Sequence, residues 1–303
     1  MFFKLGLIGH PLGHSLSPKI HTAALNSCGL EGDYSLFPIP PDNRQTLEAL
    51  LARLRTGELH GLNVTIPHKQ TVIPLLDDLT PAAKIIGAVN TIYIQNGQLT
   101  GGNTDAPGFL ADLKRFLRIG NWKLENNDDQ LPIENRQSSS IHRTSALVLG
   151  AGGSARAVVY ALLNDGWNVT LSARRIEQAE ELAASFPAFD VQIASRHEFI
   201  YHLSSFHLLV NTTPLGMSPN TGASPWPADL PFPQNAAVYD LVYNPRQTKL
   251  VREARAAGLP AVTGLGMLVE QAALSFEIWT GCAPARDMLY KAVDSDCSLL
   301  TAH

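Results

Sequence analysis

The chain has 303 residues, enough for two ordinary α/β domains with buried cores. Its 23 basic and 27 acidic residues give a formal net charge of -4 without a basic block, which argues against nucleic acid or an anionic membrane as a partner. Three widely spaced cysteines predict neither a disulfide framework nor a CxxC metal site. No apolar run has the length of a signal-peptide core or a membrane span. A cytoplasmic protein is therefore expected.

The first part of the chain alternates short apolar runs with longer helical patterns, which is typical of parallel sheets covered by helices. Strands are expected near residues 4–8, 34–38, 62–65 and 90–95. Helices are expected to start near Pro18, Asp42, Pro67 and Pro81. Proline suits a first helical turn and Asp suits a cap. The pair at residues 96–97, Asn-Gly, predicts a hairpin, so this sheet should be mixed, with an antiparallel edge.

The second part predicts another sheet after a polar, aperiodic stretch. Residues 121–143 predict a surface loop or linker. Strands are expected near residues 146–149, 168–171, 208–211, 238–241 and 261–263. From Met267 onward, apolar residues at helical spacing predict a terminal helix on which Gln271 faces a cleft.

A glycine-rich turn follows the first strand of the second sheet directly. The turn is Gly150-Ala151-Gly152-Gly153-Ser154-Ala155, a GxGxxA pattern between a strand and a helix. Gly150 permits the tight turn, Gly152 lets a pyrophosphate approach the backbone, and Ala155 allows close packing of helix and strand. The pattern therefore predicts a dinucleotide site with its phosphates at the helix N-terminus, although a plain βα turn is the alternative.

The end of the second strand of that sheet indicates which dinucleotide is bound. A site for NAD would carry Asp or Glu there, whereas this chain has Ala173, Arg174 and Arg175. Two guanidinium groups can grip a 2′-phosphate, so NADP is the expected cofactor. The alternative is that the arginines only solvate the start of a helix.

Polar side chains gather at predicted strand ends of the first sheet, where ligands bind in open α/β sheets. Ser15 and Ser17 precede the helix at Pro18, so their hydroxyls and the free amides could hold a carboxylate, with ordinary helix capping as the alternative. Lys69 and Asp105 are the candidate proton-transfer pair for reducing a ketone, in which Lys69 protonates the developing alkoxide and Asp105 holds the lysine. A surface salt bridge is the alternative for this pair.

These motifs, in this order, resemble the shikimate dehydrogenase family. The matching segments cover nearly the whole chain and are residues 9–18, 63–69, 88–91, 103–105, 150–155, 211–217, 240–245 and 264–272. The resemblance implies NADPH-dependent, reversible reduction of 3-dehydroshikimate to shikimate in aromatic amino-acid (chorismate) biosynthesis, by a monomer or homodimer whose partner is the small-molecule substrate.

The resemblance also implies a two-domain α/β architecture. An N-terminal mixed-sheet substrate domain, residues 1–118, is joined by terminal helices in residues 266–303, and a Rossmann-type NADP-binding domain spans residues 144–265 after a polar loop or linker at 119–143. Lys69 and Asp105 are implied to be catalytic. The residues implied to bind substrate are Ser15, Ser17, Asn63, Thr65, Asn90, Tyr243 and Gln271. Besides the glycine-rich turn and residues 173–175, the positions implied to contact the cofactor are Thr212, Met217, Leu241, Gly264 and Met267.

The sequence departs from the family pattern at two places. The family usually has Asn-Arg-Thr with a second Arg three residues beyond the Thr, but here Ala173-Arg174-Arg175 is followed by Gln178. The join into the second domain is also longer than usual. A quinate or dual quinate/shikimate dehydrogenase is the main alternative, and the presence of serine at both positions 15 and 17 favours shikimate. A catalytically inactive nucleotide-sensing regulator is a further alternative, against which the retained Lys69 and Asp105 argue.

Overall fold

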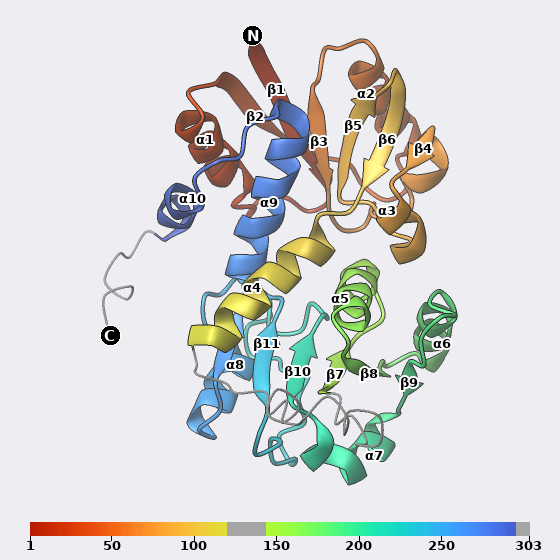
Figure 1. The fold of residues 1–303 in the computed structure, drawn as a ribbon, viewed down its shortest axis with the longest axis vertical. Helices are drawn as coiled ribbons and strands as arrows, with labels where there is room; N and C mark the ends of the chain where they lie inside the picture. Colours follow the sequence, from red (N-terminus) through yellow and green to blue (C-terminus); the bar gives the residue numbers. More distant parts are fainter. Residues whose placement is uncertain (120–143, 295–303) are drawn as a thin grey trace, which may run out of the picture. The chain divides into compact units, whose positions relative to one another are not determined.

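A computed structural model describes residues 1–119 and 144–294, which form two compact α/β units (Figure 1). Unit 1 comprises Met1–Phe109 together with Gly266–His303, and unit 2 comprises Leu110–Leu265. The predicted α/β class with two sheets is confirmed. Of the predicted linker, residues 120–143 lie outside the described part of the chain. Within the described residues, no helix is long and apolar enough to cross a membrane.

Unit 1 contains a six-stranded sheet in the order β2-β1-β3-β5-β6-β4. Its strands are β1 (Phe2–Gly9), β2 (Glu31–Pro38), β3 (Gly61–Val64), β4 (Asp78–Leu79), β5 (Thr91–Gln95) and β6 (Gln98–Gly102). β1 pairs in parallel with β2 and β3, while β5 pairs antiparallel with β3 and β6. The hairpin at Asn96 and Gly97 forms as predicted, with positive φ at both residues. The sheet is mixed, but the antiparallel strand lies inside it because the short β4 adds to the edge at β6.

The helices of unit 1 are α1 (Ser17–Ser27), α2 (Arg44–Arg55), α3 (Pro81–Ile86), α9 (Leu265–Thr280), α10 (Arg286–Val293) and the start of α4 (Asp105–Ile119). The predicted cap at Asp42 is wrong, because Asn43 accepts the N–H of Thr46 at 3.2 Å and α2 begins one residue later. The predicted helix at Pro67 is also wrong. There the buried His68 ring bonds to the Ile39 carbonyl, and the chain forms turns before a short 3₁₀ helix, η1 (Ile73–Leu75).

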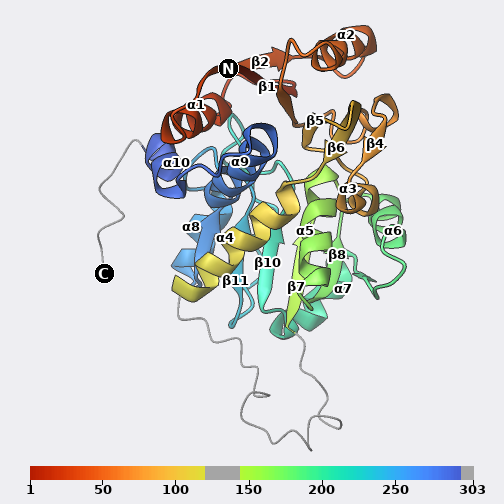
Figure 2. The ribbon, with the colours of Figure 1, turned by 45° about the horizontal axis from the view of Figure 1, so that its top comes forward.

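The core of unit 1 follows from the spacing of leucines in α2. Leu47, Leu50, Leu51 and Leu54 recur at three- and four-residue intervals, so they share one helix face. This face packs with buried strand residues such as Leu62 and with the partly buried η1. α10 lies beside α1 in both ribbon views (Figures 1 and 2).

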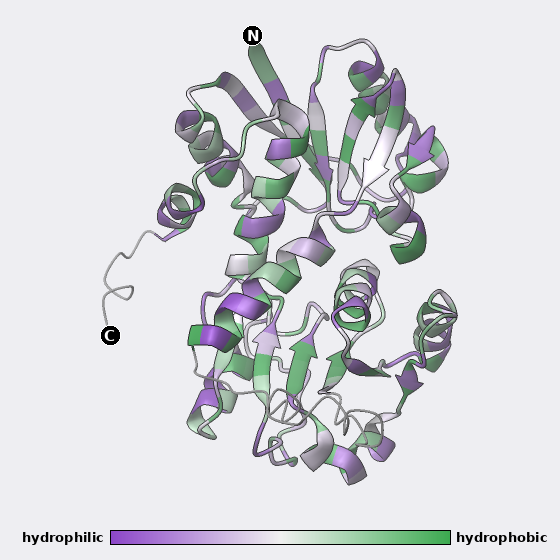
Figure 3. Ribbon diagram, viewed as in Figure 1, coloured by the Kyte–Doolittle hydropathy of each residue, from purple (hydrophilic) through white to green (hydrophobic). Residues whose placement is uncertain are grey.

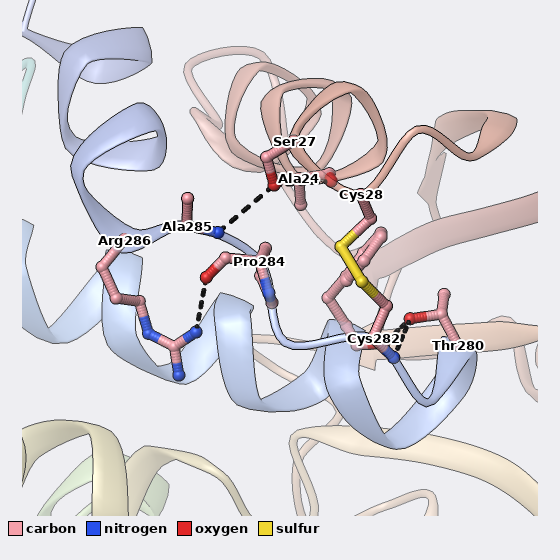
Figure 4. Close-up of a disulfide and its surroundings, with 9 residues drawn as sticks. Ala24, Ser27, Cys28, Thr280, Cys282, Pro284, Ala285 and Arg286 are labelled. Atoms are coloured by element: carbon pink, nitrogen blue, oxygen red, sulfur yellow. Dashed lines mark hydrogen bonds between the residues drawn. A yellow bond between two sulfur atoms is a disulfide. The ribbon is translucent and has the colours of Figure 1, made fainter.

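A disulfide joins Cys28, directly after α1, to Cys282, two residues after the end of α9 (Figure 4). The two Cα atoms are 6.4 Å apart although 254 positions separate them in the sequence. Beside the bond, the N–H of Ala285 donates to Ser27 Oγ at 3.3 Å. The prediction that the cysteines form no disulfide is therefore wrong. Spacing along the chain did not reveal the pair, because the last helices return to the first sheet.

Unit 2 contains a fully parallel sheet in the order β12-β11-β10-β7-β8-β9. Its strands are β7 (Ser145–Leu149), β8 (Asn168–Ser172), β9 (Gln192–Ile193), β10 (Leu208–Asn211), β11 (Ala237–Asp240) and β12 (Ala261–Thr263). Its helices, besides the rest of α4, are α5 (Gly153–Asn164), α6 (Ile176–Ala184), α7 (Arg196–Phe199), η4 (Ile200–Ser205) and α8 (Lys249–Ala256). Most residues of these strands are buried, and Figure 3 shows that they are mostly apolar. The strand order reverses between β7 and β10, which is where ligands bind in sheets of this kind.

Candidate active site

Lys69 and Asp105 form a close ion pair in unit 1. Lys69 lies in the turns after β3, and Asp105 is the first residue of α4. Lys69 Nζ is 2.7 Å from Asp105 Oδ2, and the two side chains are only 12% and 7% exposed. Such burial distinguishes this pair from the exposed Lys84–Asp78 pair of the same unit, whose side chains are 59% and 48% exposed. The alternative of an ordinary surface salt bridge therefore does not describe Lys69 and Asp105.

Asn90 orients the second oxygen of the Asp105 carboxylate. Its Nδ2 donates to Asp105 Oδ1 at 2.9 Å and approaches Gln271 Oε1 at 3.2 Å. Its Oδ1 accepts the N–H of Thr104 at 2.7 Å. Gln271 reaches this point because Gly108 of α4 lies against α9, where a Cβ would stand 2.8 Å from Gln271. The structure thus brings together four side chains that were predicted for the site, namely those of Lys69, Asn90, Asp105 and Gln271.

Asn63 extends the same polar cluster from the centre of the sheet. It lies on β3 and is buried, and its Oδ1 accepts the hydroxyl of Tyr34 on β2 at 2.8 Å. Its Nδ2 donates to the Asn90 carbonyl at 3.1 Å and to Ser275 Oγ on α9 at 3.0 Å. Burial raises the pKa of the Tyr34 phenol well above its usual range, so Tyr34 stays a hydrogen-bond donor.

Ser15 and Ser17 stand at the start of α1, next to Tyr34. Ser15 Oγ accepts the N–H of Ser17 at 3.2 Å, and the Ser17 side chain is near enough to Tyr34 to lower the pKa of its phenol against the larger effect of burial. The helix begins at Ser17, and Leu16 at the cap position provides no side-chain bond. Thr65, directly after β3, is half-buried, and its N–H donates to the Ile8 carbonyl. The predicted substrate residues of unit 1 therefore lie at the carboxyl ends of β1 and β3 and on the neighbouring helices.

The glycine-rich turn in unit 2 has an open backbone. Gly150 follows β7 with a φ of 110°, and a Cβ there would stand 2.6 Å from Thr212 Oγ1, so only glycine fits. Gly152 caps α5 without a side-chain bond, and a Cβ on it would meet nothing within 4 Å. Ala155 is fully buried. These residues fit a dinucleotide, because the first N–H groups of a helix have no partner within the helix and can bind a pyrophosphate.

The other predicted cofactor residues follow the carboxyl ends of neighbouring strands of unit 2. Arg174 and Arg175 are exposed after β8, beyond the half-buried Ala173. Thr212 follows β10 and donates to the Leu149 carbonyl at 2.7 Å, and Leu241 follows β11. Gly264 follows β12, where a Cβ would collide with the backbone of Leu241. The exposed Met217 completes this group.

Two predicted residues lie in a different unit from their expected neighbours. Tyr243, predicted to bind substrate, belongs to unit 2, where burial raises the pKa of its hydroxyl. Met267, predicted to contact the cofactor, belongs to unit 1 and is buried. Their roles stay predictions.

A buried carboxylate fixes the loops that carry Thr212 and Leu241. Asp240 Oδ1 accepts from Asn211 Nδ2 at 2.8 Å and from the Val242 N–H at 3.0 Å. Its other oxygen accepts the Thr248 hydroxyl at 2.6 Å. Burial raises the pKa of Asp240 to about 6, while these hydrogen bonds act in the opposite direction.

Sequence reasoning missed Tyr34 and Ser275 as members of the polar cluster and did not assign a role to Thr104. Ser275 is one helical turn beyond Gln271, and residues four apart share a helix face. That spacing was the available signal, but the flanking alanines and Phe276 made the segment resemble ordinary core.

The comparisons with known proteins agree along the whole chain. Residues 7–92 match the model of the shikimate dehydrogenase substrate binding domain, and residues 264–293 match that of the shikimate 5'-dehydrogenase C-terminal domain. The chain is 40% identical to a shikimate dehydrogenase (NADP(+)) of Salinibacter ruber over 96% of both chains. It is 36% identical to one of Bacillus subtilis over 92% of both.

A solved structure gives the same result. Shikimate 5-dehydrogenase of Thermus thermophilus, crystallised with NADP(H) and shikimate, is 38% identical to this chain. It matches with a TM-score of 0.78 over 96% of this chain and 98% of its own. The chain belongs to the shikimate dehydrogenase family.

Proposed function

We propose that this protein reduces 3-dehydroshikimate to shikimate reversibly with NADPH, a step in aromatic amino-acid biosynthesis. Family membership supports this reaction, and the buried Lys69–Asp105 pair is the observation that carries it. A protein that only senses nucleotides has no use for a lysine held at 2.7 Å from a nearly buried carboxylate among amides.

The residues of unit 1 suit a carboxylated ring with hydroxyl groups. Ser15 and Ser17 offer hydroxyls at the start of α1 for the carboxylate, where the helix end also favours negative charge. Asn63, Asn90 and Gln271 supply amide groups for ring hydroxyls, with Thr65 beside them. Tyr243 is proposed to contact the ring.

Lys69 is proposed to move the proton. NADP supplies or accepts the hydride when it is bound at the turn of residues 150–155. As the ketone carbon gains hydride, its oxygen becomes an alkoxide, and Lys69 Nζ donates a proton to give the alcohol. In the reverse direction Lys69 takes that proton. Asp105 holds the ammonium group in place through the bond at 2.7 Å, and Asn90 fixes the carboxylate.

The proposal is tested by following NADPH absorbance with 3-dehydroshikimate, and NADP⁺ reduction with shikimate and with quinate. Lys69→Ala and Asp105→Asn should lower kcat by roughly two to four orders of magnitude. Lys84→Ala, which breaks an exposed lysine–aspartate pair of the same unit, is the matched control and should leave kcat near the parent value. Normal turnover by Lys69→Ala would overturn the proton-transfer role. Faster turnover of quinate than of shikimate would identify a quinate dehydrogenase.

A cytoplasmic location and a monomeric or homodimeric state stay predictions. Cell fractionation and light scattering of the purified protein test them.

A further inference from the structure

Ser275 lies in the middle of a continuous run of buried hydrogen bonds. The run begins at Tyr34, whose hydroxyl donates to Asn63 Oδ1 at 2.8 Å. Asn63 Nδ2 then donates to Ser275 Oγ at 3.0 Å. Because the Ser275 oxygen accepts this bond, its own hydrogen is available for another partner.

From Ser275 the run continues to the proton-transfer pair. Ser275 Oγ is 2.9 Å from Thr104 Oγ1, which in turn donates to Asn90 Oδ1 at 3.2 Å. Asn90 Nδ2 donates to Asp105 Oδ1 at 2.9 Å. Either hydroxyl of the Ser275–Thr104 pair can be the donor, because Asn90 Nδ2 also donates to Thr104 Oγ1 at 2.9 Å. The run of hydrogen bonds is therefore continuous from Tyr34 to the Asp105 carboxylate, and bonds connected in this way polarise one another.

The surroundings of Ser275 explain why a hydroxyl stands there. Ser275 is fully buried on α9 between apolar residues, including Ala272 and Phe276. A hydroxyl in such a place destabilises the fold unless it is hydrogen-bonded. Among the described residues, Ser275 is the one side chain that bonds to both Asn63 and Thr104. The other hydrogen bond that Asn63 Nδ2 donates goes to the main-chain carbonyl of Asn90, not to a side chain.

We propose that Ser275 is a positioning residue for the proposed reduction. Its hydroxyl fixes the amide of Asn63, which is proposed to bind the ring, and fixes Asn90 through Thr104. Ser275 thereby connects the substrate amide to the carboxylate that holds Lys69. It contacts no substrate itself. This inference rests on the proposed function of the site.

Loss of the Ser275 hydroxyl should have a moderate effect that differs between substrates. In Ser275→Ala, Asn63 keeps its bonds to Tyr34 and to the Asn90 carbonyl but loses its third partner. We expect kcat/KM for shikimate to fall by about tenfold, mainly through a higher KM for shikimate, with KM for NADP⁺ unchanged, because the cofactor residues of unit 2 are untouched. Ser275→Cys keeps a side chain of similar shape with a weaker donor, so its KM should lie between those of the parent and Ser275→Ala.

The control is Thr280→Val on the same helix. The Thr280 hydroxyl donates to the Phe276 carbonyl at 2.8 Å and takes no part in the run. It should lower Tm without changing KM for shikimate. If Ser275→Ala does not fold, Ser275→Cys provides the same comparison.

A double variant shows whether Ser275 acts through Asn63. In an Asn63→Ala background, adding Ser275→Ala should raise the dissociation constant of shikimate far less than it does in the parent, because one of the two groups that Ser275 orients is gone. If the parent turns over shikimate, either of two results would overturn this inference alone. One is an unchanged KM for shikimate in Ser275→Ala, and the other is full additivity of the two substitutions in the double variant. A parent that does not turn over shikimate would overturn the proposed function and this inference with it.

Discussion

Reducing the Cys28–Cys282 disulfide should lower the free energy of unfolding of unit 1 by several kcal/mol. The bond closes a loop across 254 positions. In the chain-entropy model, a loop of this length restricts the unfolded chain by about 5.5 kcal/mol near room temperature. If unit 2 stays folded while unit 1 unfolds, roughly 100 flexible residues remain in the loop, and the same relation gives about 4.7 kcal/mol. Native disulfides often contribute less than this model predicts, so we expect a loss of about 2 to 5 kcal/mol.

The measurement is urea unfolding of the whole chain with and without a thiol-free reductant, followed by tryptophan fluorescence. Trp279 reports on unit 1, since it lies beside His21. Thiol titration in denaturant should find one free thiol in the oxidised protein and all three cysteines after reduction. Cys28→Ser should be insensitive to the reductant, while Cys297→Ser should respond like the parent. Equal midpoints with and without reductant, once thiol titration has shown the bond, would refute the loop-entropy reasoning.

Three further predictions follow from other residues. Burial lowers the pKa of His21 from 6.5 to about 3, so the folded state resists protonation, and stability should be complete above pH 6.5 and decrease as the pH falls toward 3. At 1.36 kcal/mol per pH unit, the free energy of unfolding should fall by roughly 4 kcal/mol over this range. His21→Phe retains a ring that can stack on Tyr34 but has no group that titrates. Calorimetry should therefore find that the Tm of this variant changes less between pH 6 and 4 than the Tm of the parent. Replacing both Ser15 and Ser17 by Ala should raise KM for shikimate far more than it weakens NADPH binding, and an unchanged KM would mean that they only cap α1. The parent should prefer NADPH over NADH by at least about tenfold, since a single bond to a charged group contributes about 1.5 to 3 kcal/mol. The double variant Arg174→Asp, Arg175→Ala should lose this preference. Equal catalytic efficiency of the parent with both cofactors would show that the arginines are solvated surface.

His21 is a buried ring that packs well but has no hydrogen-bond partner for its nitrogens among the described residues. It stacks on Tyr34 with ring centroids 4.2 Å apart. Neither ring nitrogen has a partner within hydrogen-bonding geometry among the described residues, although Asn63 is near enough to raise the pKa slightly against the larger effect of burial. Burial therefore keeps the ring neutral at the position where it stacks on Tyr34.

The sequence predicted those parts of the fold that depend on local pattern. Runs of β-branched and aliphatic residues correctly located nine of the strands from β1 to β12, and the Asn96-Gly97 turn implied β6; the two that were missed, β4 and β9, have only two residues each. Strands that short carry no period to detect. The cap was assigned to Asp42 rather than Asn43 because both residue types favour that position, and only the bond to Thr46 distinguishes them.

Prediction of the site depended on where strands end. Lys69 and Asp105 were paired because ketone reduction needs a proton donor and a group that holds it, and because their segments lie at a predicted strand end or a helix start; the structure brings them to 2.7 Å. Contacts made by α9 could not be predicted in the same way. The Ser275 bonds and the Cys28–Cys282 disulfide join residues more than 150 positions apart, and no local pattern encodes such pairs.

The return of α9 to the first sheet also affects how the chain is made. Unit 2 is one uninterrupted segment, so it can fold as soon as its last strand leaves the ribosome. Unit 1 is interrupted, and Asn63 and Thr104 are synthesised long before Ser275. Until α9 emerges, Asn63 and Thr104 lack the hydrogen bonds that they make to Ser275, and water takes the place of its hydroxyl. A truncated chain that ends at Leu265 and has been released from the ribosome should therefore contain a folded second unit and an N-terminal segment that proteases cleave.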